Sequence, residues 1–209
     1  MSTNLEPLGT DARAELHDTA EQSQLIVKLR RENSILRREI QRLMVFRQMA
    51  YRDCLTGLHN RRYFEERLRE ECARATRTDG YSFSVILLDI DDFKSVNDTL
   101  GHASGDDVLV SVARFLRESI REVDLPCRLG GDEFALLLPA TDEPGARVVE
   151  GRLRAAMARG IEGPCPVSLS VGVAAHPPGP AEGDTILAQA DTAMYLDKRQ
   201  RKAGRRSQA

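Results

Sequence analysis

Residues 127–138 read CRLGGDEFALLL, and this stretch decides how the rest of the chain is interpreted. The pair Gly130-Gly131 separates a short strand-like segment from the apolar run at residues 134–138. Two adjacent glycines suit a tight β-hairpin because glycine adopts positive φ without steric cost. The stretch therefore predicts a hairpin whose tip carries two carboxylates, Asp132 and Glu133.

Segments with alternating strand and helix patterns flank this hairpin. In chain order they are a turn at residues 53–62 leading into a helix, a buried strand at 83–88 with an acidic turn at 89–92, a helix at 108–120, the hairpin, a helix at 146–157, a strand at 167–173, and a last helix capped by Asp184. The order is β-α-β-β-α-β with a further helix at each end. It predicts an α+β fold, a ferredoxin-like mixed sheet with helices on one face.

The N-terminal part of the chain follows a coiled-coil pattern. The a and d positions are Ile26, Leu29, Asn33, Leu36, Ile40, Leu43, Arg47 and Ala50. Isoleucine at a with leucine at d favours two parallel strands, and a single asparagine such as Asn33 at a fixes register and dimer state. Glu32 at g can also meet Arg37 at e of the partner helix. We therefore predict that residues 21–52 form a parallel, homodimeric coiled-coil stalk.

Other interpretations of this segment are weaker. A single amphipathic helix packed on its own domain would show the same short pattern. A basic zipper that binds DNA fits less well, because the arginines lie within the heptads and no separate basic region precedes them. We therefore expect no nucleic-acid partner.

The composition suits one globular domain with an appendage, since 41% of the 209 residues are apolar and the net charge is −2. Neither a long apolar run nor a signal-peptide pattern occurs, so we expect a cytoplasmic protein that does not enter a membrane. The four cysteines form no C-x-x-C pair, which argues against a zinc site or a disulfide framework. We expect a disordered leader at residues 1–20, the globular domain at 53–200 and a basic tail at 201–209.

The expected topology brings carboxylates together from distant parts of the chain. The first strand and the hairpin are neighbours in such a sheet, so Asp89 can approach Asp132 and Glu133. Converging carboxylates without histidine or cysteine suit a hard cation, typically magnesium where a phosphate completes the shell. A solvated acidic turn is the alternative, and the two glycines can serve either a ligand's close approach or the turn alone.

Residues 93–106 read FKSVNDTLGHASGD, and we expect a loop here that leads into a helix. Asn97 and Asp106 are suited to bond a base edge, and Lys94 to meet phosphate oxygens. Asp106 can equally begin the following helix, where an acidic residue is favourable. The residues alone leave both interpretations open.

Five blocks of this sequence resemble one protein family. They are DCLTGLHNRR, LLDIDDFKSVNDTLGHASGDD, RLGGDEF, VSLSVGVA and ADTAMYLDK, in this order between residues 53 and 198. In these blocks the chain resembles the GGDEF domain of the diguanylate cyclase family. The resemblance implies a nucleotide-cyclase-like form of the sheet, preceded here by the coiled-coil helix.

The resemblance implies an enzyme that condenses two GTP molecules into cyclic di-GMP and releases two pyrophosphates. Each subunit binds one GTP in this family, so two domains must face each other. By resemblance, Asp89 and Asp132 carry magnesium ions, with manganese as the alternative, and the carbonyl of Ile90 is a further ligand. Glu133 is implied to lie near the reacting ribose.

A nucleotide site is also implied by the resemblance. Its expected members are Asn97 and Asp106 for guanine, His102 close to the nucleotide, Phe93 and Lys94 for phosphate, Gly130 and Gly131 for room, and Lys198 for the triphosphate. The family's usual Gly-Arg-Asn after this lysine is replaced by other residues, so Arg201 and Lys202 are alternatives to Lys198. Asp132 stands where glutamate is common, and either carboxylate ligates magnesium.

The family further implies a site for the product. Arg121 and Asp124 form an R-x-x-D set before the hairpin, which in this family binds cyclic di-GMP and inhibits the enzyme. Arg152 is the expected second arginine, with Arg154 as the alternative. A module that binds cyclic di-GMP without catalysis is the competing interpretation. Because no sensor domain is recognisable, we expect a regulatory protein that acts on the stalk.

Overall fold

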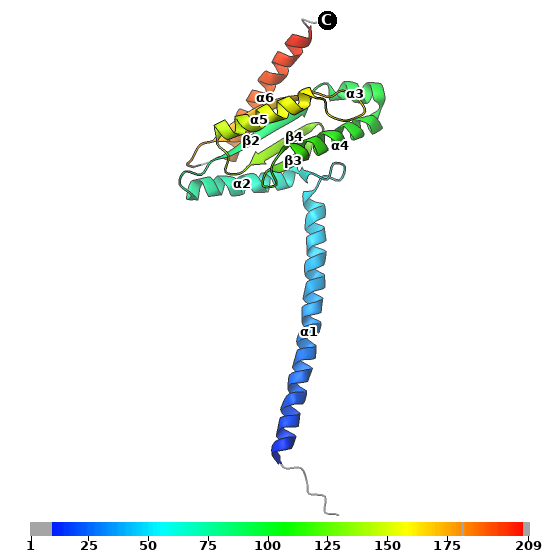
Figure 1. The fold of residues 1–209 in the computed structure, drawn as a ribbon, viewed down its shortest axis with the longest axis vertical. Helices are drawn as coiled ribbons and strands as arrows, with labels where there is room; N and C mark the ends of the chain where they lie inside the picture. Colours follow the sequence, from blue (N-terminus) through cyan, green and yellow to red (C-terminus); the bar gives the residue numbers. More distant parts are fainter. Residues whose placement is uncertain (1–9, 181, 207–209) are drawn as a thin grey trace, which may run out of the picture. The chain divides into compact units, whose positions relative to one another are not determined.

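The structure is a computed structural model that describes residues 10–180 and 182–206 (Figure 1). Side chains are described for residues 24–204 except 48 and 181. The chain divides into two compact units, residues 1–50 and residues 51–209, and each is described by itself.

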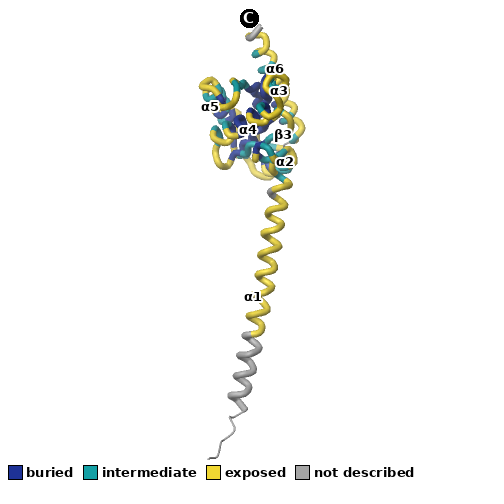
Figure 2. The backbone as a smooth tube through the Cα atoms, turned by 90° about the vertical axis from the view of Figure 1, so that its right-hand side faces the viewer, coloured by how far each residue is buried: buried dark blue, intermediate teal, exposed yellow. Residues whose placement is uncertain are grey.

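The first unit consists mainly of helix α1 (Thr10–Tyr51). Apolar residues at five predicted seam positions are between 49% and 61% exposed; they are Ile26, Leu29, Leu36, Ile40 and Leu43. Figure 2 shows that the described part of this helix is exposed along its length. Exposed leucine and isoleucine at coiled-coil spacing are typical of a helix that pairs with another.

Helix α1 begins earlier than we expected. Residues 10–20 are helical, whereas the sequence patterns suggested a disordered leader through residue 20; residues 1–9 lie outside the described part. No glycine or proline occurs between Gly9 and Gly57, so the sequence contains no strong helix breaker over this range. Residues 10–20 therefore form a helix although they show no hydrophobic period.

The second unit is built on a five-stranded sheet. Its elements are β1 (His59–Asn60), α2 (Arg61–Arg77), β2 (Phe83–Ile90), α3 (Phe93–Leu100), α4 (His102–Ser119), β3 (Leu125–Gly130), β4 (Glu133–Leu138), α5 (Glu143–Ala158), β5 (Leu169–His176) and α6 (Gly183–Arg206). The strand order is β1-β3-β4-β2-β5, with β2 antiparallel to both β4 and β5. From β2 to β5 the chain follows the predicted β-α-β-β-α-β order, so the ferredoxin-like sheet is confirmed.

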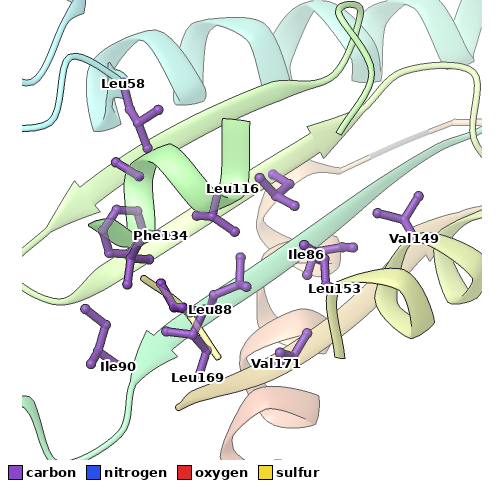
Figure 3. Close-up of a cluster of buried hydrophobic side chains, with 14 of the residues drawn as sticks. Leu58, Ile86, Leu88, Ile90, Leu116, Phe134, Val149, Leu153, Leu169 and Val171 are labelled. Carbon is purple, nitrogen blue, oxygen red and sulfur yellow. The ribbon is translucent and has the colours of Figure 1, made fainter. Parts of the chain in front are cut away.

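Helices cover both faces of the sheet, which corrects our expectation of helices on one face. α4 and α5 pack on one face over a core that includes Ile86 and Leu88 (Figure 3). α2 and α6 pack on the other face over Val85 and Leu87. All eight residues of β2 are therefore buried. A strand covered on both faces has a nearly continuous apolar run, in place of the alternation that a one-sided sheet shows.

Two further segments differ from the sequence-based expectation. Residues 93–100 form helix α3, where we predicted a loop, and Phe93 and Val96 of this helix pack against the core. This segment contains small and amide residues that are typical of loops, so its short helical period was not recognised in the sequence. Helix α6 continues to Arg206 and includes much of the predicted basic tail.

Across the described ranges, the structure contains no helix with the length and apolar character that a membrane span requires.

Candidate active site

The pairing of β2 with β4 brings the predicted carboxylates together. Asp89 on β2 lies opposite Glu133, the first residue of β4. The N–H of Ile90 donates a hydrogen bond of 3.2 Å to the carbonyl of Asp132. These four residues therefore meet at one corner of the sheet, although they come from distant parts of the chain.

Asp89 is buried at this corner beside a lysine. It is 8% exposed, and its Oδ1 lies 2.5 Å from Nζ of Lys198 on α6. Burial raises the pKa of the Asp89 carboxyl, the Lys198 ammonium opposes this, and the nearby carboxylates of Asp132 and Asp91 raise the pKa further. Burial lowers the pKa of Lys198, but its hydrogen bond and ion pair with Asp89 leave that pKa raised. A buried carboxylate next to other carboxylates favours bound positive charge.

The corner also offers oxygen ligands for a divalent cation. Asp89 and Asp132 provide carboxylates, and the backbone carbonyl of Ile90 is adjacent in sequence. Within residues 24–204, as far as they are described, no three His, Cys, Asp or Glu side chains gather closely enough to hold a metal ion by themselves. A hard cation here would complete its shell with oxygens of a ligand, as magnesium does beside phosphates. The donor set fits magnesium or manganese and contains no soft ligand.

Asp91, to which we had given no role, is buried and holds two strands together. It accepts hydrogen bonds from the hydroxyls of Ser168, 2.6 Å, and Ser170, 2.5 Å. Its N–H donates to the carbonyl of Ser168, 2.9 Å. Asp91 thereby joins the end of β2 to the start of β5. The sequence signal was the D-x-D spacing, which does not distinguish a cation ligand from a residue bonded to a neighbouring strand.

The hairpin tip is exposed to solvent, and Arg128 holds its backbone in place. Gly130 and Gly131 have φ of +145° and +52°, and a Cβ at either would meet no atom within 4 Å. Arg128 donates from Nε and Nη2 to the carbonyl of Gly131, at 3.0 and 2.8 Å, and from Nη1 to Asp53, 3.1 Å. Burial tends to raise the pKa of Asp53, but bonds from Thr56 and Arg128 lower it. The tip therefore combines an open surface with a fixed backbone.

Glu133 has more solvent around it than Asp89. Its side chain is 48% exposed, and Oε2 lies 3.4 Å from Nη2 of Arg61 on α2. Arg61 and Glu133 are among the charged residues that line a cavity of about 330 Å³ bordered by α2, α6 and the hairpin. We did not predict this cavity or a contact to Arg61.

Helices α3 and α4 position the residues expected to bind guanine. Asn97 lies on α3, and its carboxamide occupies the space that a Cβ at Gly105 of α4 would fill. Asp106, the next residue of α4, is exposed, as are Lys94 and His102. Asn97 therefore lies against α4 at the residue before Asp106, and a joint binding site for guanine stays a prediction.

Asp197 fixes helix α6 next to the corner. It accepts hydrogen bonds from the N–H of Val171 on β5, 2.9 Å, and from Nε of Arg201, 3.0 Å. It also forms an ion pair of 3.2 Å with Arg154 on α5. Burial opposes ionisation of Asp197, but these bonds and charges lower its pKa. Asp197 could not be recognised from the sequence, because an acid before a lysine has no distinctive pattern.

Of the three basic residues considered for the triphosphate, Lys198 contacts the corner directly. Arg201 is bonded to Asp197, and its Nη1 lies 4.0 Å from Oδ2 of Asp91. Lys202 is exposed. Lys198 therefore lies nearest to the acidic corner, with Arg201 beside it, and the residue that binds the triphosphate stays a prediction.

The R-x-x-D set lies on another part of the surface. The N–H of Arg121 donates to Oδ2 of Asp124, 3.0 Å, and Asp124 is buried while Arg121 is exposed. Both line a shallow pocket of about 770 Å³. Arg152 is exposed on α5 and does not line this pocket, and the alternative, Arg154, is bound to Glu150 and Asp197. The structure thus joins Arg121 to Asp124 but brings neither Arg152 nor Arg154 to them.

The comparison with protein families agrees with this geometry. The family described as "Diguanylate cyclase, GGDEF domain" matches residues 50–204. The chain belongs to the GGDEF family. Among curated proteins, this GGDEF chain is 43% identical to Diguanylate cyclase DgcP of Pseudomonas aeruginosa over 157 residues, which are 73% of this chain and 23% of DgcP. It therefore spans less than a quarter of that relative.

Solved structures show the same likeness. Diguanylate cyclase SiaD of Pseudomonas aeruginosa, crystallised in complex with its activator SiaC, aligns with a TM-score of 0.68 at 37% identity and covers 91% of this chain and 76% of that chain. The coiled coil and GGDEF domain of DgcB from Caulobacter crescentus, in complex with c-di-GMP, aligns with a TM-score of 0.74 at 30% identity and covers 84% of this chain and 95% of that chain. The second alignment spans a coiled coil together with a GGDEF domain.

Proposed function

We propose that this chain is a diguanylate cyclase that condenses two GTP molecules into cyclic di-GMP and two pyrophosphates. The observation that carries the proposal is the corner where Asp89 and Lys198 form a partly buried pair beside Asp132. In the reaction the 3′-hydroxyl oxygen of one GTP bonds to the α-phosphorus of the other, and the bond to pyrophosphate breaks. Repetition of this step with the roles exchanged closes the ring.

The carboxylates of Asp89 and Asp132 and the carbonyl of Ile90 would hold the divalent cations. Magnesium, or manganese, bound there would polarise the phosphates and lower the proton affinity of the attacking hydroxyl. Glu133 would assist at the reacting ribose, either in cation binding or in removing the hydroxyl proton. Lys198 would meet the triphosphate from the same corner, and Arg201 is the second cation within reach of it.

The nucleotide would lie between the hairpin and helices α3 and α4. Asn97 and Asp106 supply an amide and a carboxylate, which together complement the donors and acceptors on a guanine edge. Phe93, Lys94 and His102 would border the same site. The bare backbone of Gly130 and Gly131 would leave room for the phosphates.

Two subunits would be required, since each would bring one GTP. The exposed seam of α1 supports a parallel homodimer that raises the effective concentration of one half-site beside the other. Cyclic di-GMP bound at Arg121 and Asp124 would inhibit the enzyme, whereas Arg152 does not line their pocket and its part in product binding stays a prediction.

A regulatory protein on the stalk is a further part of this proposal. SiaD, which resembles this chain over most of its length, was crystallised with its activator SiaC. Helix α1 here also exposes apolar residues outside the seam, among them Met44, Val45 and Met49. A two-stranded coiled coil buries a and d positions, so these side chains would remain available to a partner.

The decisive experiment is incubation of the purified chain with GTP and magnesium, with cyclic di-GMP measured by chromatography. We expect turnover that ceases with chelator and in Asp132→Ala, while Asp79→Ala, in an exposed loop, retains wild-type activity. Added cyclic di-GMP should inhibit the wild type more strongly than Arg121→Ala.

Absence of product at high protein concentration, with either magnesium or manganese, would reject the enzymatic proposal. Binding of cyclic di-GMP by such an inactive chain would instead support a binding module.

A further inference from the structure

Arg61, on helix α2, bonds to both strands of the hairpin near its tip. Arg61 donates from Nε to the carbonyl of Leu129, 2.9 Å, and its Nη2 lies 3.4 Å from Oε2 of Glu133. Leu129 is on the incoming strand of the hairpin and Glu133 on the outgoing strand. One guanidinium therefore connects both strands to α2.

The Leu129 carbonyl lies at an irregularity of the hairpin. Arg128 pairs with Phe134 and Gly130 pairs with Glu133, so two steps along β3 match one step along β4. Leu129 is the extra residue of a β-bulge, a feature that interrupts the ladder and redirects neighbouring side chains. A backbone carbonyl outside the ladder needs another donor. Arg61 supplies this donor.

The bulge sets the position of the candidate catalytic acids. It is followed directly by Gly130, Gly131 and Asp132, and neither glycine would have an atom within 4 Å of an added Cβ. Little side-chain packing therefore restrains the tip, and its position depends on bonds at its base. Arg61 provides such bonds on the α2 side, complementary to those from Arg128.

The location of Arg61 also argues for a specific role. Arg61 is the first residue of α2, directly after the N-cap Asn60, whose side chain accepts a hydrogen bond from Tyr63. The positive end of the helix dipole disfavours a cation at this position. The two side chains of the Arg61–Glu133 pair are 56% and 48% exposed, and such pairs contribute little to stability.

We propose that Arg61 is a positioning residue, which locks the bulge at Leu129 and holds the Glu133 carboxylate toward the reacting nucleotide. The proposal rests on the cyclase function proposed above. Because Arg61 acts through the hairpin and Glu133, its loss should affect the rate of the chemical step more than GTP binding or folding.

The test compares Arg61→Ala, Arg61→Lys and the matched control Arg69→Ala. Arg69 is an exposed arginine of the same helix, and its Nε bonds within the helix to the carbonyl of Glu65. We expect Arg61→Ala to lower kcat about ten- to a hundredfold, with KM for GTP changed less than about threefold and Tm less than about 2 °C. Arg61→Lys should recover part of kcat, since an ammonium replaces only part of the planar fork. Arg69→Ala should behave as wild type.

Amide hydrogen exchange of residues 129–133 gives an independent measurement. Exchange should accelerate in Arg61→Ala and not in Arg69→Ala. Wild-type exchange of the hairpin in Arg61→Ala, or a kcat within twofold of wild type, would overturn the proposal. A wild-type chain that converts no GTP would reject the cyclase function, while hydrogen exchange would still decide whether Arg61 restrains the hairpin.

Discussion

At the scale of single residues, the site depends on charges neutralised by residues far away in the sequence. Asp89 pairs with Lys198, and Arg128 pairs with Asp53. In both pairs each side chain is at most about one-third exposed, so the interaction is less screened than on the open surface. The fold thus controls the electrostatics of the corner.

His59 offers a test of such control through pH. Its ring stacks on Tyr63, with centroids 4.0 Å apart, and burial together with the positive charges of Arg52 and Arg67 lowers its pKa from 6.5 to about 4. Between about pH 6.5 and pH 4, His59 is therefore protonated in the unfolded chain but neutral in the folded chain. The free energy of unfolding decreases as the pH drops through this range.

We expect His59→Phe, which keeps an aromatic ring against Tyr63 but cannot titrate, to lose less stability than wild type between pH 7.5 and pH 5. The difference should be roughly 1 kcal/mol after solvent screening is allowed for, measured by thermal denaturation at both pH values. Parallel pH dependence in the two proteins would show that His59 does not titrate in this way.

Some contacts of the candidate site could be predicted from the sequence and others could not. The meeting of Asp89 with Asp132 followed from topology alone, because strand order determines which residues are neighbours. The contacts of Arg61 and Asp197 did not, because each depends on where a long side chain or a neighbouring helix lies in space. No period or spacing encodes that information.

At the scale of elements, α3 and α4 approach each other closely where Asn97 meets Gly105, and we expect these two helices to form the nucleotide side of the candidate site. A Cβ at Gly105 would overlap Oδ1 of Asn97, whereas the backbone of Gly105 has no positive φ that demands glycine. Space for Asn97 is therefore the physical reason for glycine here.

We expect Gly105→Ala to displace the Asn97 side chain and to raise KM for GTP roughly tenfold. This change corresponds to the loss of about one hydrogen bond between the protein and the base. The fold should remain intact, because only the end of a side chain has to move. Steady-state kinetics and thermal denaturation test both statements.

The matched control is Gly151→Ala, in the interior of α5, where an added Cβ would meet nothing within 4 Å. It should leave KM unchanged and stabilise the protein by roughly 0.5–1 kcal/mol. An unchanged KM in Gly105→Ala as well would remove Asn97 from the nucleotide site.

The same elements explain which parts of the fold were predictable. Long segments such as α4 and α5 carry a clear helical period, and β2 was recognised by its apolar run. That run also contained the information that both faces of β2 are covered, but a buried strand alone does not say which helices cover it. β1 is too short for a period, and α3 was hidden by residues that also favour loops.

At the scale of the whole molecule, the chain carries one set of site residues, whereas the proposed reaction joins two bound nucleotides. A stalk that holds two chains together would supply the second set. We expect the exposed seam of α1 to serve this purpose, with its single asparagine, Asn33, favouring one register over others. Dimerisation and turnover should therefore depend on the same residues.

Leu36→Asp tests this dependence, because it places two carboxylates at a d position where the partner helices would meet. We expect a monomer by light scattering, with GTP binding retained and cyclic di-GMP production reduced more than about tenfold at nanomolar protein, since half-sites then meet only by diffusion. Activity per chain should recover as protein concentration rises. Gln41→Asp adds the same charge to the same helix at a b position outside the seam and should stay dimeric and active. A Leu36→Asp chain that turns over GTP at the wild-type rate at every concentration would separate catalysis from the stalk.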